Sequence, residues 1–220
     1  MKKSRCKYCS RTDSFKGEGV AMSVISKDSE HKDSPSMRDV SGVILAGGKS
    51  SRYGKNKALV KINDIPLIER VIRVMRSVFQ HLILITNTPD EYAYLKLPMH
   101  EDLIRGLGPL GGIFTALTVM PNDAGFFVAC DMPFLNQELI RHMVEIRDDF
   151  DAVVPRISGK MQTLHTLYSK GCVPAIRRLI DSQKYQVIRV FHEVSVRYVD
   201  EEEIRGLDPE IRSFFDMNKP

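Results

Sequence analysis

An α/β fold with a mainly parallel sheet is predicted for this chain, and three observations support it. Apolar, strand-like runs alternate with helical patterns from residue 41 onward. The first of these runs ends abruptly in two glycines, as expected for a buried strand that delivers a loop. Acidic or amide residues follow several of the later runs. Ligands bind at such strand ends in open α/β sheets, so the same pattern locates a candidate site.

The first half of the domain is predicted to contain three strands and one helix before its central loop. Val43–Ala46 is the first strand, because it is a short apolar run that ends at a glycine. After a turn at Asp64–Pro66, apolar residues recur at the spacing of a helix with one buried face: Ile68, Val71, Ile72, Met75 and Phe79. A second strand is expected at His81–Thr86 and a short one near Met99–Glu101.

The second half repeats the alternation. A glycine- and proline-containing loop from Gly106 to Gly112 leads into a helix that runs through Met120. The apolar run Phe126–Cys130 predicts a further buried strand that ends at Asp131. The remaining predicted elements are helices near Asn136–Arg147 and Val173–Ile180, and strands near Ala152–Pro155, Leu164–Tyr168 and Val194–Val199.

The composition excludes several classes of partner. The formal charge of +4 comes from 32 basic and 28 acidic residues without a long basic block, which argues against nucleic acid as a partner. No apolar run reaches the length of about 18 residues that a membrane-spanning helix needs, so no membrane partner is expected. Four cysteines and the lack of a signal-peptide pattern near Met1 favour a reducing, cytoplasmic location without disulfides.

Residues 1–40 differ in composition from the rest of the chain. They are rich in Ser, Lys and Asp and poor in large apolar residues, so we predict a mostly disordered N-terminal extension before a folded domain at residues 41–220. Cys6 and Cys9 form a Cys-x-x-Cys pair in this extension. A structural zinc site needs four ligands and no second pair follows, so the pair is interpreted as a surface feature.

The loop after the first strand has the composition of a phosphate-binding loop. Gly47 and Gly48 allow backbone N–H groups to approach an anion closely, and basic residues follow at Lys49, Arg52, Lys55 and Lys57. The spacing differs from that of a Walker A loop, and the dinucleotide fingerprint Gly-x-Gly-x-x-Gly is absent. The loop therefore indicates nucleotide binding of another class.

Polar residues at other strand ends are expected to meet this loop in one cleft. They are Asn87, Asp102, the Gly108–Gly112 turn and Asp131. Asp131 directly follows a buried strand and is well suited to Mg²⁺, which takes one or two protein carboxylates and completes its shell with substrate phosphates. A helix N-cap or a plain turn residue is the alternative interpretation of Asp131.

Among the basic residues, Lys57 is the predicted catalytic one. Its position is fixed by the apolar residues that follow it, and a lysine held in this way can neutralise charge that develops on phosphates during nucleotidyl transfer. Lys49 and Lys55 are interpreted as solvated charges, and Arg52 either reaches the phosphates or caps the loop. His165 is expected to be a hydrogen-bonded structural histidine, since no Ser-His-Asp or Cys-His arrangement is evident.

These motifs together resemble the nucleotidyltransferases that include the molybdenum cofactor guanylyltransferases. The opening signature is Leu-Ala-Gly-Gly-Lys-Ser-Ser-Arg-Tyr-Gly-Lys-Asn-Lys-Ala-Leu at residues 45–59. Glu101-Asp102, Gly-Pro-Leu-Gly-Gly-Ile at residues 108–113 and Cys-Asp-Met-Pro at residues 130–133 follow in the order of that family. The combination of Leu-Ala-Gly-Gly with Cys-Asp-Met-Pro is more similar to the guanylyl branch than to the cytidylyl or sugar-phosphate members.

The resemblance implies a Rossmann-like three-layer α/β/α sandwich, of the nucleotide-diphospho-sugar transferase type, for the nucleotidyltransferase domain at residues 41–220. It also implies transfer of GMP from Mg-GTP to the phosphate of molybdopterin, with release of pyrophosphate. The residues implied to bind GTP are Leu45, Ala46, Gly47, Gly48, Arg52, Lys57, Asn87, Asp102 and Asp131. Lys57 and Asp131 are the implied catalytic residues, and Asp131 is the implied ligand of Mg²⁺.

Two other functions stay open at this point. One is a cytidylyl- or sugar-phosphate nucleotidyltransferase of the same fold. The other is a catalytically silent nucleotide-binding partner of molybdoenzymes, which the C-terminus allows because Asp216 and Lys219 stand where the family has asparagine and threonine. Other cofactor-biosynthesis proteins or molybdoenzyme chaperones are possible partners.

Overall fold

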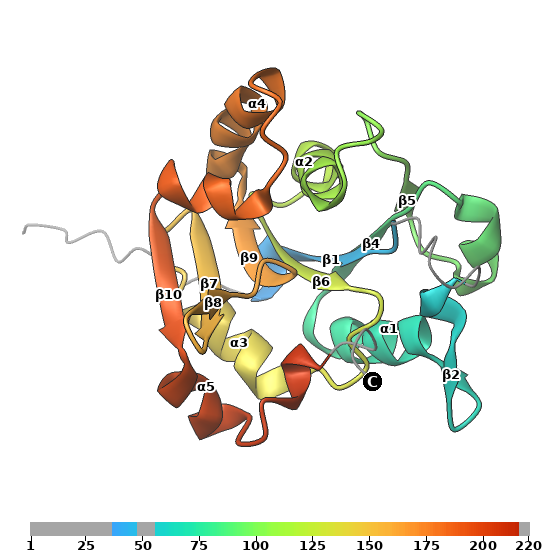
Figure 1. Ribbon diagram of the computed structural model, residues 1–220. Helices are drawn as coiled ribbons and strands as arrows, with labels where there is room; N and C mark the ends of the chain where they lie inside the picture. Colours follow the sequence, from blue (N-terminus) through green and yellow to red (C-terminus); the bar gives the residue numbers. More distant parts are fainter. Residues whose placement is uncertain (1–36, 48–55, 216–220) are drawn as a thin grey trace, which may run out of the picture. The chain divides into compact units, whose positions relative to one another are not determined.

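A central sheet organises the domain (Figure 1). The structure, a computed structural model, describes residues 37–47 and 56–215. Within this part the strand order is β10-β7-β9-β6-β1-β4-β5, and β8 pairs with β7. The strands are β1 (Val40–Leu45), β4 (His81–Ile85), β5 (Met99–His100), β6 (Ala124–Ala129), β7 (Ala152–Ile157), β8 (Lys160–Met161), β9 (His165–Ser169) and β10 (Val196–Asp200).

Most neighbouring strands in the sheet are parallel. The pairs β1–β4, β1–β6, β4–β5 and β7–β10 are parallel, whereas β9 runs antiparallel to both β6 and β7, and β8 runs antiparallel to β7. The prediction of a mainly parallel sheet is therefore confirmed. The second sheet is a short hairpin of β2 (Lys61–Ile62) and β3 (Ile65–Pro66), which precedes α1.

Helices cover both faces of the sheet, which makes the three-layer sandwich that the family resemblance implies (Figure 1). One face carries α1 (Leu67–Val78), α3 (Gln137–Glu145) and α5 (Glu201–Leu207), and the other carries α2 (Pro109–Val119) and α4 (Val173–Asp181). The remaining turns of helix are 3-10: η1 (Met37–Asp39), η2 (Lys57–Leu59), η3 (Pro89–Leu95), η4 (Lys170–Cys172), η5 (Val187–His192) and η6 (Arg212–Phe214).

The central strand β1 is buried along its whole length because helices cover both of its faces. Ile44 contributes to the apolar cluster on the α1 side, and Val43 and Leu45 contribute to the cluster on the α2 side. Gly42 allows side chains of β4 and of the end of α1 to pack closely on the strand, since a Cβ there would lie 2.7 Å from Leu82 Cδ1 and 3.0 Å from Phe79 Cδ2. Any larger residue would require these side chains to shift.

The helix predicted after residue 66 is confirmed as α1. Its whole predicted stripe is buried, and Phe79 forms the C-cap. None of the helices in the described ranges is long and apolar enough to cross a bilayer.

Several details differ from the prediction. β1 begins three residues earlier than expected, at Val40. The loop expected at Gly106–Gly112 ends at Gly108, because Pro109 occupies the first helical position of α2, where its missing N–H costs nothing. Helix α5 was not predicted, since its residues Glu201–Leu207 include one buried side chain and so show no apolar period.

Candidate active site

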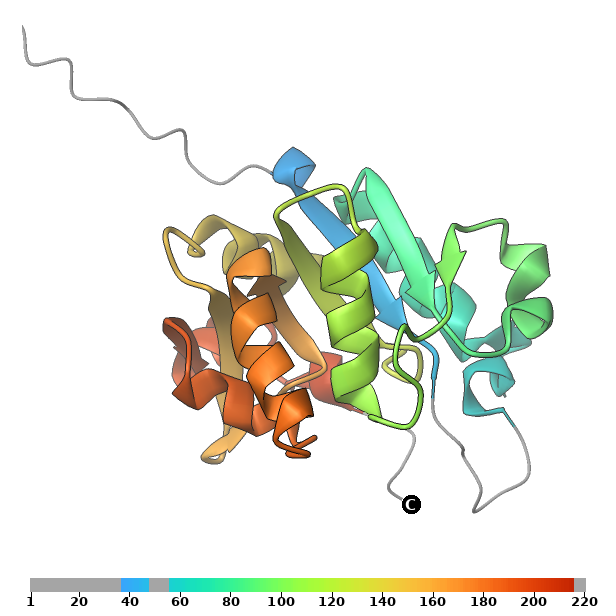
Figure 2. The same ribbon diagram turned by 90° about the horizontal axis from the view of Figure 1, so that it is seen from above.

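The carboxyl ends of four strands lie in one register row. Leu45 of β1 pairs with Ile85 of β4 and with Ala129 of β6, and Ile85 pairs with His100 of β5. Two residues beyond each member of this row stand, in the same order, Gly47, Asn87, Asp131 and Asp102. The arrows of β1 and β4 point to this common edge in Figure 2. The sheet thus brings together four of the predicted site residues.

The chain also changes direction at this edge. After β1 the chain continues to β4, which lies on one flank of the β1–β6 pair in the strand order. After β6 it continues to β7, which lies on the opposite flank. Diverging connections of this kind open a crevice beyond the strand ends, and ligands bind there in doubly wound folds. The topology therefore predicts a binding crevice between β1 and β6, whose ends carry Gly47 and Asp131.

Asn87 and Asp102 form a cross-linked pair at the β4–β5 side of this edge. Asn87 Nδ2 donates to Asp102 Oδ2 at 2.7 Å, and the Asp102 backbone N–H donates to Asn87 Oδ1 at 3.1 Å. The next residue is held from the other side, because the Leu103 N–H donates to Thr115 Oγ1 in α2 at 2.9 Å. The Asp102 carboxylate is therefore oriented by β4 and by α2 together.

Two glycines allow α2 to begin directly against the candidate site. A Cβ on Gly112 would lie 3.2 Å from Leu45 Cδ2 and 3.7 Å from Asp102 Oδ1. A Cβ on Gly111 would lie 3.1 Å from the carbonyl oxygen of Ile104. The preceding Gly108 has φ 61° and ψ −146°, a conformation that residues with a side chain rarely adopt. The Gly-Pro-Leu-Gly-Gly sequence thus serves close packing around Asp102.

Lys57 is held by the residue before it. Asn56 caps η2, since its Oδ1 accepts from the Ala58 N–H at 3.0 Å. The amide nitrogen of Asn56 donates to Glu91 Oε2 at 2.6 Å and to Tyr92 Oη at 2.7 Å, both in η3. The backbone at Lys57 is consequently anchored to η3, and the sequence analysis did not identify this anchor. An asparagine before a short helix is a recognisable cap signal, but this signal does not reveal the bonds to η3.

Tyr92 and Cys130 stay protonated near this anchor. Burial raises the pKa of Tyr92 to about 12, although the hydrogen bond from Asn56 acts in the opposite direction. Burial, followed by the neighbouring Asp131, raises the pKa of Cys130 to about 12. A thiol with such a pKa is a poor nucleophile at neutral pH. Cys130 therefore offers no covalent chemistry beside Asp131.

Asp131 lies in the turn that follows β6 and is half-buried. The strand end before it is fixed, because the Cys130 N–H donates to the Leu45 carbonyl oxygen at 3.1 Å. The N-cap of the next helix, α3, is Asn136 and not Asp131. Among the described residues no three His, Cys, Asp or Glu side chains cluster as a ready-made metal site. A cation at Asp131 would complete its shell with water and phosphate oxygens, as Mg²⁺ does in nucleotide sites.

Other predicted residues contribute differently or cannot be placed. Leu45 and Ala46 are buried, and the Ala46 N–H is used by the sheet, where it donates to the Ile85 carbonyl oxygen at 2.9 Å. Gly47, in contrast, is exposed at the strand end. Four of the predicted loop residues lie outside the described residues: Gly48, Lys49, Arg52 and Lys55. The Cys6–Cys9 pair lies outside them as well.

His165 is a core residue, but it is not hydrogen-bonded as expected. Its ring is fully buried, 5.1 Å from the Phe126 ring in an edge contact and 4.7 Å from the Phe214 ring. Neither ring nitrogen has a hydrogen-bond partner among the described residues. Burial lowers the pKa of His165 to about 3, with a small opposing effect of Asp208. The expectation of a satisfied histidine was wrong because tertiary packing surrounds the ring with aromatic carbon.

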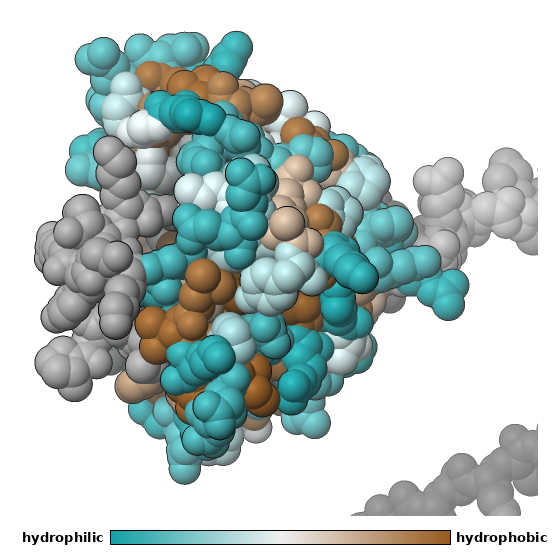
Figure 3. Space-filling model, turned by 90° about the vertical axis from the view of Figure 1, so that its right-hand side faces the viewer, coloured by the Kyte–Doolittle hydropathy of each residue, from teal (hydrophilic) through white to brown (hydrophobic). Residues whose placement is uncertain are grey.

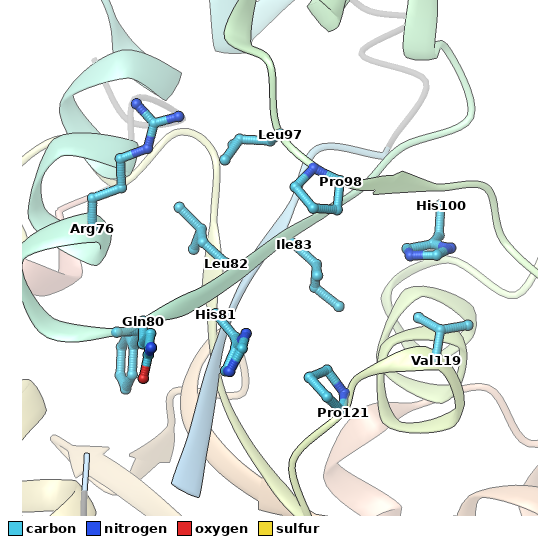
Figure 4. A pocket seen from close by; sticks show the side chains of 11 residues that line it. Arg76, Gln80, His81, Leu82, Ile83, Leu97, Pro98, His100, Val119 and Pro121 are labelled. Carbon is cyan, nitrogen blue, oxygen red and sulfur yellow. The ribbon is translucent and has the colours of Figure 1, made fainter. Parts of the chain in front are cut away.

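A groove of about 410 Å³ lies elsewhere, on the outer side of β4 (Figure 4). It is lined by Arg76, Phe79, Gln80, His81, Leu82, Ile83, Leu97, Pro98, His100, Val119 and Pro121. None of the predicted site residues that the structure describes lines it. The groove extends from His81, at the amino end of β4, to His100, at the carboxyl end of β5. On the coloured part of the face in Figure 3, apolar patches are broken up by polar side chains.

The chain matches a known family over most of the folded domain. Residues 42–197 match the family described as "MobA-like NTP transferase domain". A "Probable molybdenum cofactor guanylyltransferase" of Pelotomaculum thermopropionicum is 40% identical over 184 residues, which are 84% of this chain and 90% of the relative. A protein of the same name from Carboxydothermus hydrogenoformans is 38% identical over 168 residues, 76% of this chain and 85% of the relative.

A solved structure shares the fold. The molybdopterin-guanine dinucleotide biosynthesis protein A from Archaeoglobus fulgidus has a TM-score of 0.72 and 25% sequence identity, over 82% of this chain and 93% of that protein. The family match covers β1, β4, β5 and β6 with the strand-end residues described above. The chain belongs to the MobA-like NTP transferases, within the molybdenum cofactor guanylyltransferase family.

Proposed function

We propose that this protein transfers GMP from Mg-GTP to the terminal phosphate of molybdopterin and releases pyrophosphate. The observation that supports the proposal most strongly is the common offset of Gly47, Asn87, Asp102 and Asp131 from one register row. Polar groups at equal distance from adjacent parallel strand ends face one crevice, which is where this fold binds nucleotides. Family membership supplies the identity of the two substrates.

The residues at the β1–β6 side fit the phosphates and the metal. Gly47 offers an exposed backbone at the end of β1, and the half-buried Asp131 carboxylate would hold Mg²⁺ two residues beyond the paired end of β6. Mg²⁺ bound there would neutralise the triphosphate and orient the α-phosphate for in-line attack. One protein carboxylate with substrate oxygens matches the donor set that this ion prefers.

The residues at the β4–β5 side fit the nucleoside. The Asn87–Asp102 pair keeps one carboxylate and one amide oriented at the site, and each retains hydrogen-bonding capacity beyond the bonds that join them. Such groups suit the hydroxyl and N–H donors of a guanosine. Because the pair is preorganised by β4 and α2, little conformational entropy is lost on nucleotide binding.

Lys57 would bind the phosphates and stabilise the charge that grows on the leaving pyrophosphate. Its backbone is anchored through Asn56 to Glu91 and Tyr92, so the Lys57 side chain extends from a fixed point. The attacking pterin phosphate is already an anion and needs no strong general base.

Cys130 and Cys172 are free thiols, which accords with a cytoplasmic location.

The test is a panel of nucleotides with molybdopterin as acceptor. The protein is incubated with Mg²⁺, molybdopterin and GTP, CTP or ATP, and both pyrophosphate and the dinucleotide product are measured. GTP should be the preferred donor and molybdopterin guanine dinucleotide the product. Preference for CTP or a sugar phosphate would assign the chain to another branch of the fold. GTP binding without pyrophosphate release would identify a silent nucleotide-binding protein.

A further inference from the structure

The loop that carries Asp131 also contacts a segment near the C-terminus. The loop connects β6 to α3 and runs from Cys130 to Asn136. Its first end is fixed to the sheet by the bond from the Cys130 N–H to the Leu45 carbonyl oxygen. Its far end and its middle are fixed by residues 207–215, more than 70 positions later in the chain.

Asn136 joins the far end of the loop to this segment by two hydrogen bonds. Its backbone N–H donates to Ser213 Oγ at 2.9 Å, and its Nδ2 donates to the Leu207 carbonyl oxygen at 2.9 Å. Its Oδ1 accepts from the N–H groups of the second and third residues of α3, Glu138 and Leu139. One asparagine therefore joins the end of the loop, the start of α3 and the 207–215 segment.

The middle of the loop is held by aromatic contacts. The Arg212 guanidinium carbon lies 4.9 Å from the centroid of the Phe134 ring, and the Phe215 ring lies 5.9 Å from it. The residues on either side of Phe134 are buried or nearly so, since Met132 and Leu135 belong to the apolar cluster against which Phe214 packs. These contacts restrict the loop between its two fixed ends.

The segment is itself rigid enough to act as a support. Asp208 is buried, and its carboxylate accepts from the Arg212 N–H at 3.1 Å and from the Ser213 N–H at 2.8 Å. The turn that these bonds close contains Ile211 at φ 55° and ψ 32°. Ser213 has no exposed surface. Asp208 thus fixes the residue whose hydroxyl fixes Asn136.

We propose that residues 207–215 position Asp131 for metal binding, and that Ser213 and Asp208 are the positioning residues. This inference rests on the proposed function, because it requires Asp131 to hold the divalent cation. Neither residue needs to touch a substrate. Groups that orient metal ligands through hydrogen bonds commonly change metal affinity or activity by about 10–100-fold when they are replaced. Loss of the Ser213 hydroxyl leaves the part-buried Asn136 N–H without this acceptor and loosens the end of the loop.

The experiment compares Ser213→Ala with Ser41→Ala. Ser41 is equally buried and hydrogen-bonded, to Asn122 Oδ1 at 2.9 Å, but it lies toward the amino end of β1, away from the candidate site. The serines are therefore matched in burial and differ in place. Binding of Mn²⁺ is measured by the electron paramagnetic resonance of the free ion, with GTP present and molybdopterin absent. Amide hydrogen exchange is measured on the metal-free proteins.

Ser213→Ala should weaken Mn²⁺ binding roughly 10-fold and speed amide exchange in residues 131–136. Ser41→Ala should leave both unchanged, even if its melting temperature falls as far. Phe215→Ala is the second variant in case Ser213→Ala does not fold, since Phe215 is 48% exposed and its removal leaves the core intact. Phe215→Ala should also weaken Mn²⁺ binding, because Phe134 loses a contact.

Asp131→Asn separates the two proposals. If Asp131→Asn binds Mn²⁺ as the wild type does, the metal role in the proposed function is wrong. If Asp131→Asn loses the ion while Ser213→Ala and Phe215→Ala keep wild-type affinity and exchange, the proposed function stands and the positioning role of residues 207–215 is overturned.

Discussion

Asn87 and Asp102 join the ends of two adjacent strands by reciprocal hydrogen bonds, from the Asn87 amide to the Asp102 carboxylate at 2.7 Å and from the Asp102 N–H to the Asn87 carbonyl at 3.1 Å. The pair is separated by 15 positions in the chain and links β4 to β5, which share only two register pairs, Leu84–Met99 and Ile85–His100. It therefore strengthens a short ladder and orients a carboxylate at the same time.

Replacement of Asn87 by aspartate should disrupt this pair. Two carboxylates would then face each other, and their repulsion would turn the Asp102 side chain away. We expect kcat/KM for GTP to fall roughly 10-fold, mainly through KM, because the ground-state contacts are lost. Steady-state kinetics check this. Asn122→Asp is the matched control, since Asn122 also bonds a distant residue, Ser41, but toward the other end of β1. Equal effects of the two variants would contradict the role of the pair.

Gly112→Ala should lower activity without unfolding the protein. The added Cβ would lie 3.2 Å from Leu45 Cδ2, which must move slightly, and would come into van der Waals contact with Asp102 Oδ1 at 3.7 Å. The gain in helix propensity of about 1 kcal/mol offsets part of the steric cost. We expect a several-fold rise in KM for GTP with a small change in melting temperature.

Gly206→Ala is the control for that experiment. Gly206 lies in α5, and a Cβ there has no heavy atom within 4 Å. This variant should gain stability by about 0.5–1 kcal/mol and keep its KM. If Gly112→Ala also keeps its KM, close packing of α2 against Asp102 is not needed for nucleotide binding.

Lys57→Ala should reduce kcat by roughly 100-fold, because it removes a held cation from the phosphates. Lys61→Ala removes an exposed lysine from the adjacent strand β2 and should stay near the wild-type rate. Lys49→Ala should likewise have little effect. Rates of pyrophosphate release at saturating GTP measure the difference. Comparable losses in all three variants would show that net positive charge, and not Lys57 in particular, assists the reaction.

His165 should make the protein sensitive to acid. Its pKa is lowered by burial to about 3 in the folded state, below the ordinary value of 6.5, so the unfolded chain binds the proton first. The contribution of His165 to the free energy of unfolding is therefore fully present above pH 6.5, and it is lost as the pH falls from 6.5 toward 3.

His165→Phe tests this dependence. Between about pH 7 and about pH 4.5 the wild type should lose roughly 2 kcal/mol more unfolding free energy than the variant does. Urea denaturation at the two pH values gives the difference, and contributions of other groups cancel in the comparison. Parallel losses in the two proteins would mean that His165 is solvated or protonated in the folded state.

The site residues could be predicted where they end a local, periodic pattern of apolar residues. Apolar runs that end at Gly47, Asn87 or Asp131 identify strand ends, and parallel pairing brings such ends to one edge. The support around these residues was not predictable. The bonds of Asn56 to η3 and of Asn136 to residues 207 and 213 join positions far apart in the chain, and nothing in the local pattern announces them.

Two features of the fold, the surroundings of His165 and the helix α5, depend on tertiary contacts that the sequence pattern does not show. His165 alternates with apolar residues like any strand histidine, and only the packing of Phe126 and Phe214 against it decides that its nitrogens lack partners. The α5 helix has too few buried residues for a period, although Ile204 anchors it to the core. Both outcomes are tertiary in origin.

The most direct test of metal and nucleotide binding at Asp131 is the rate of pyrophosphate release from Mg-GTP and molybdopterin. This rate is compared between Asp131→Asn and Asp123→Asn. The two aspartates lie beyond opposite ends of the same strand, β6, and Asp123 is an exposed residue paired with Lys170. We expect the rate to fall roughly 100-fold or more in Asp131→Asn and to stay at the wild-type value in Asp123→Asn. A wild-type rate in Asp131→Asn would contradict the assignment of the metal and nucleotide to this edge of the sheet.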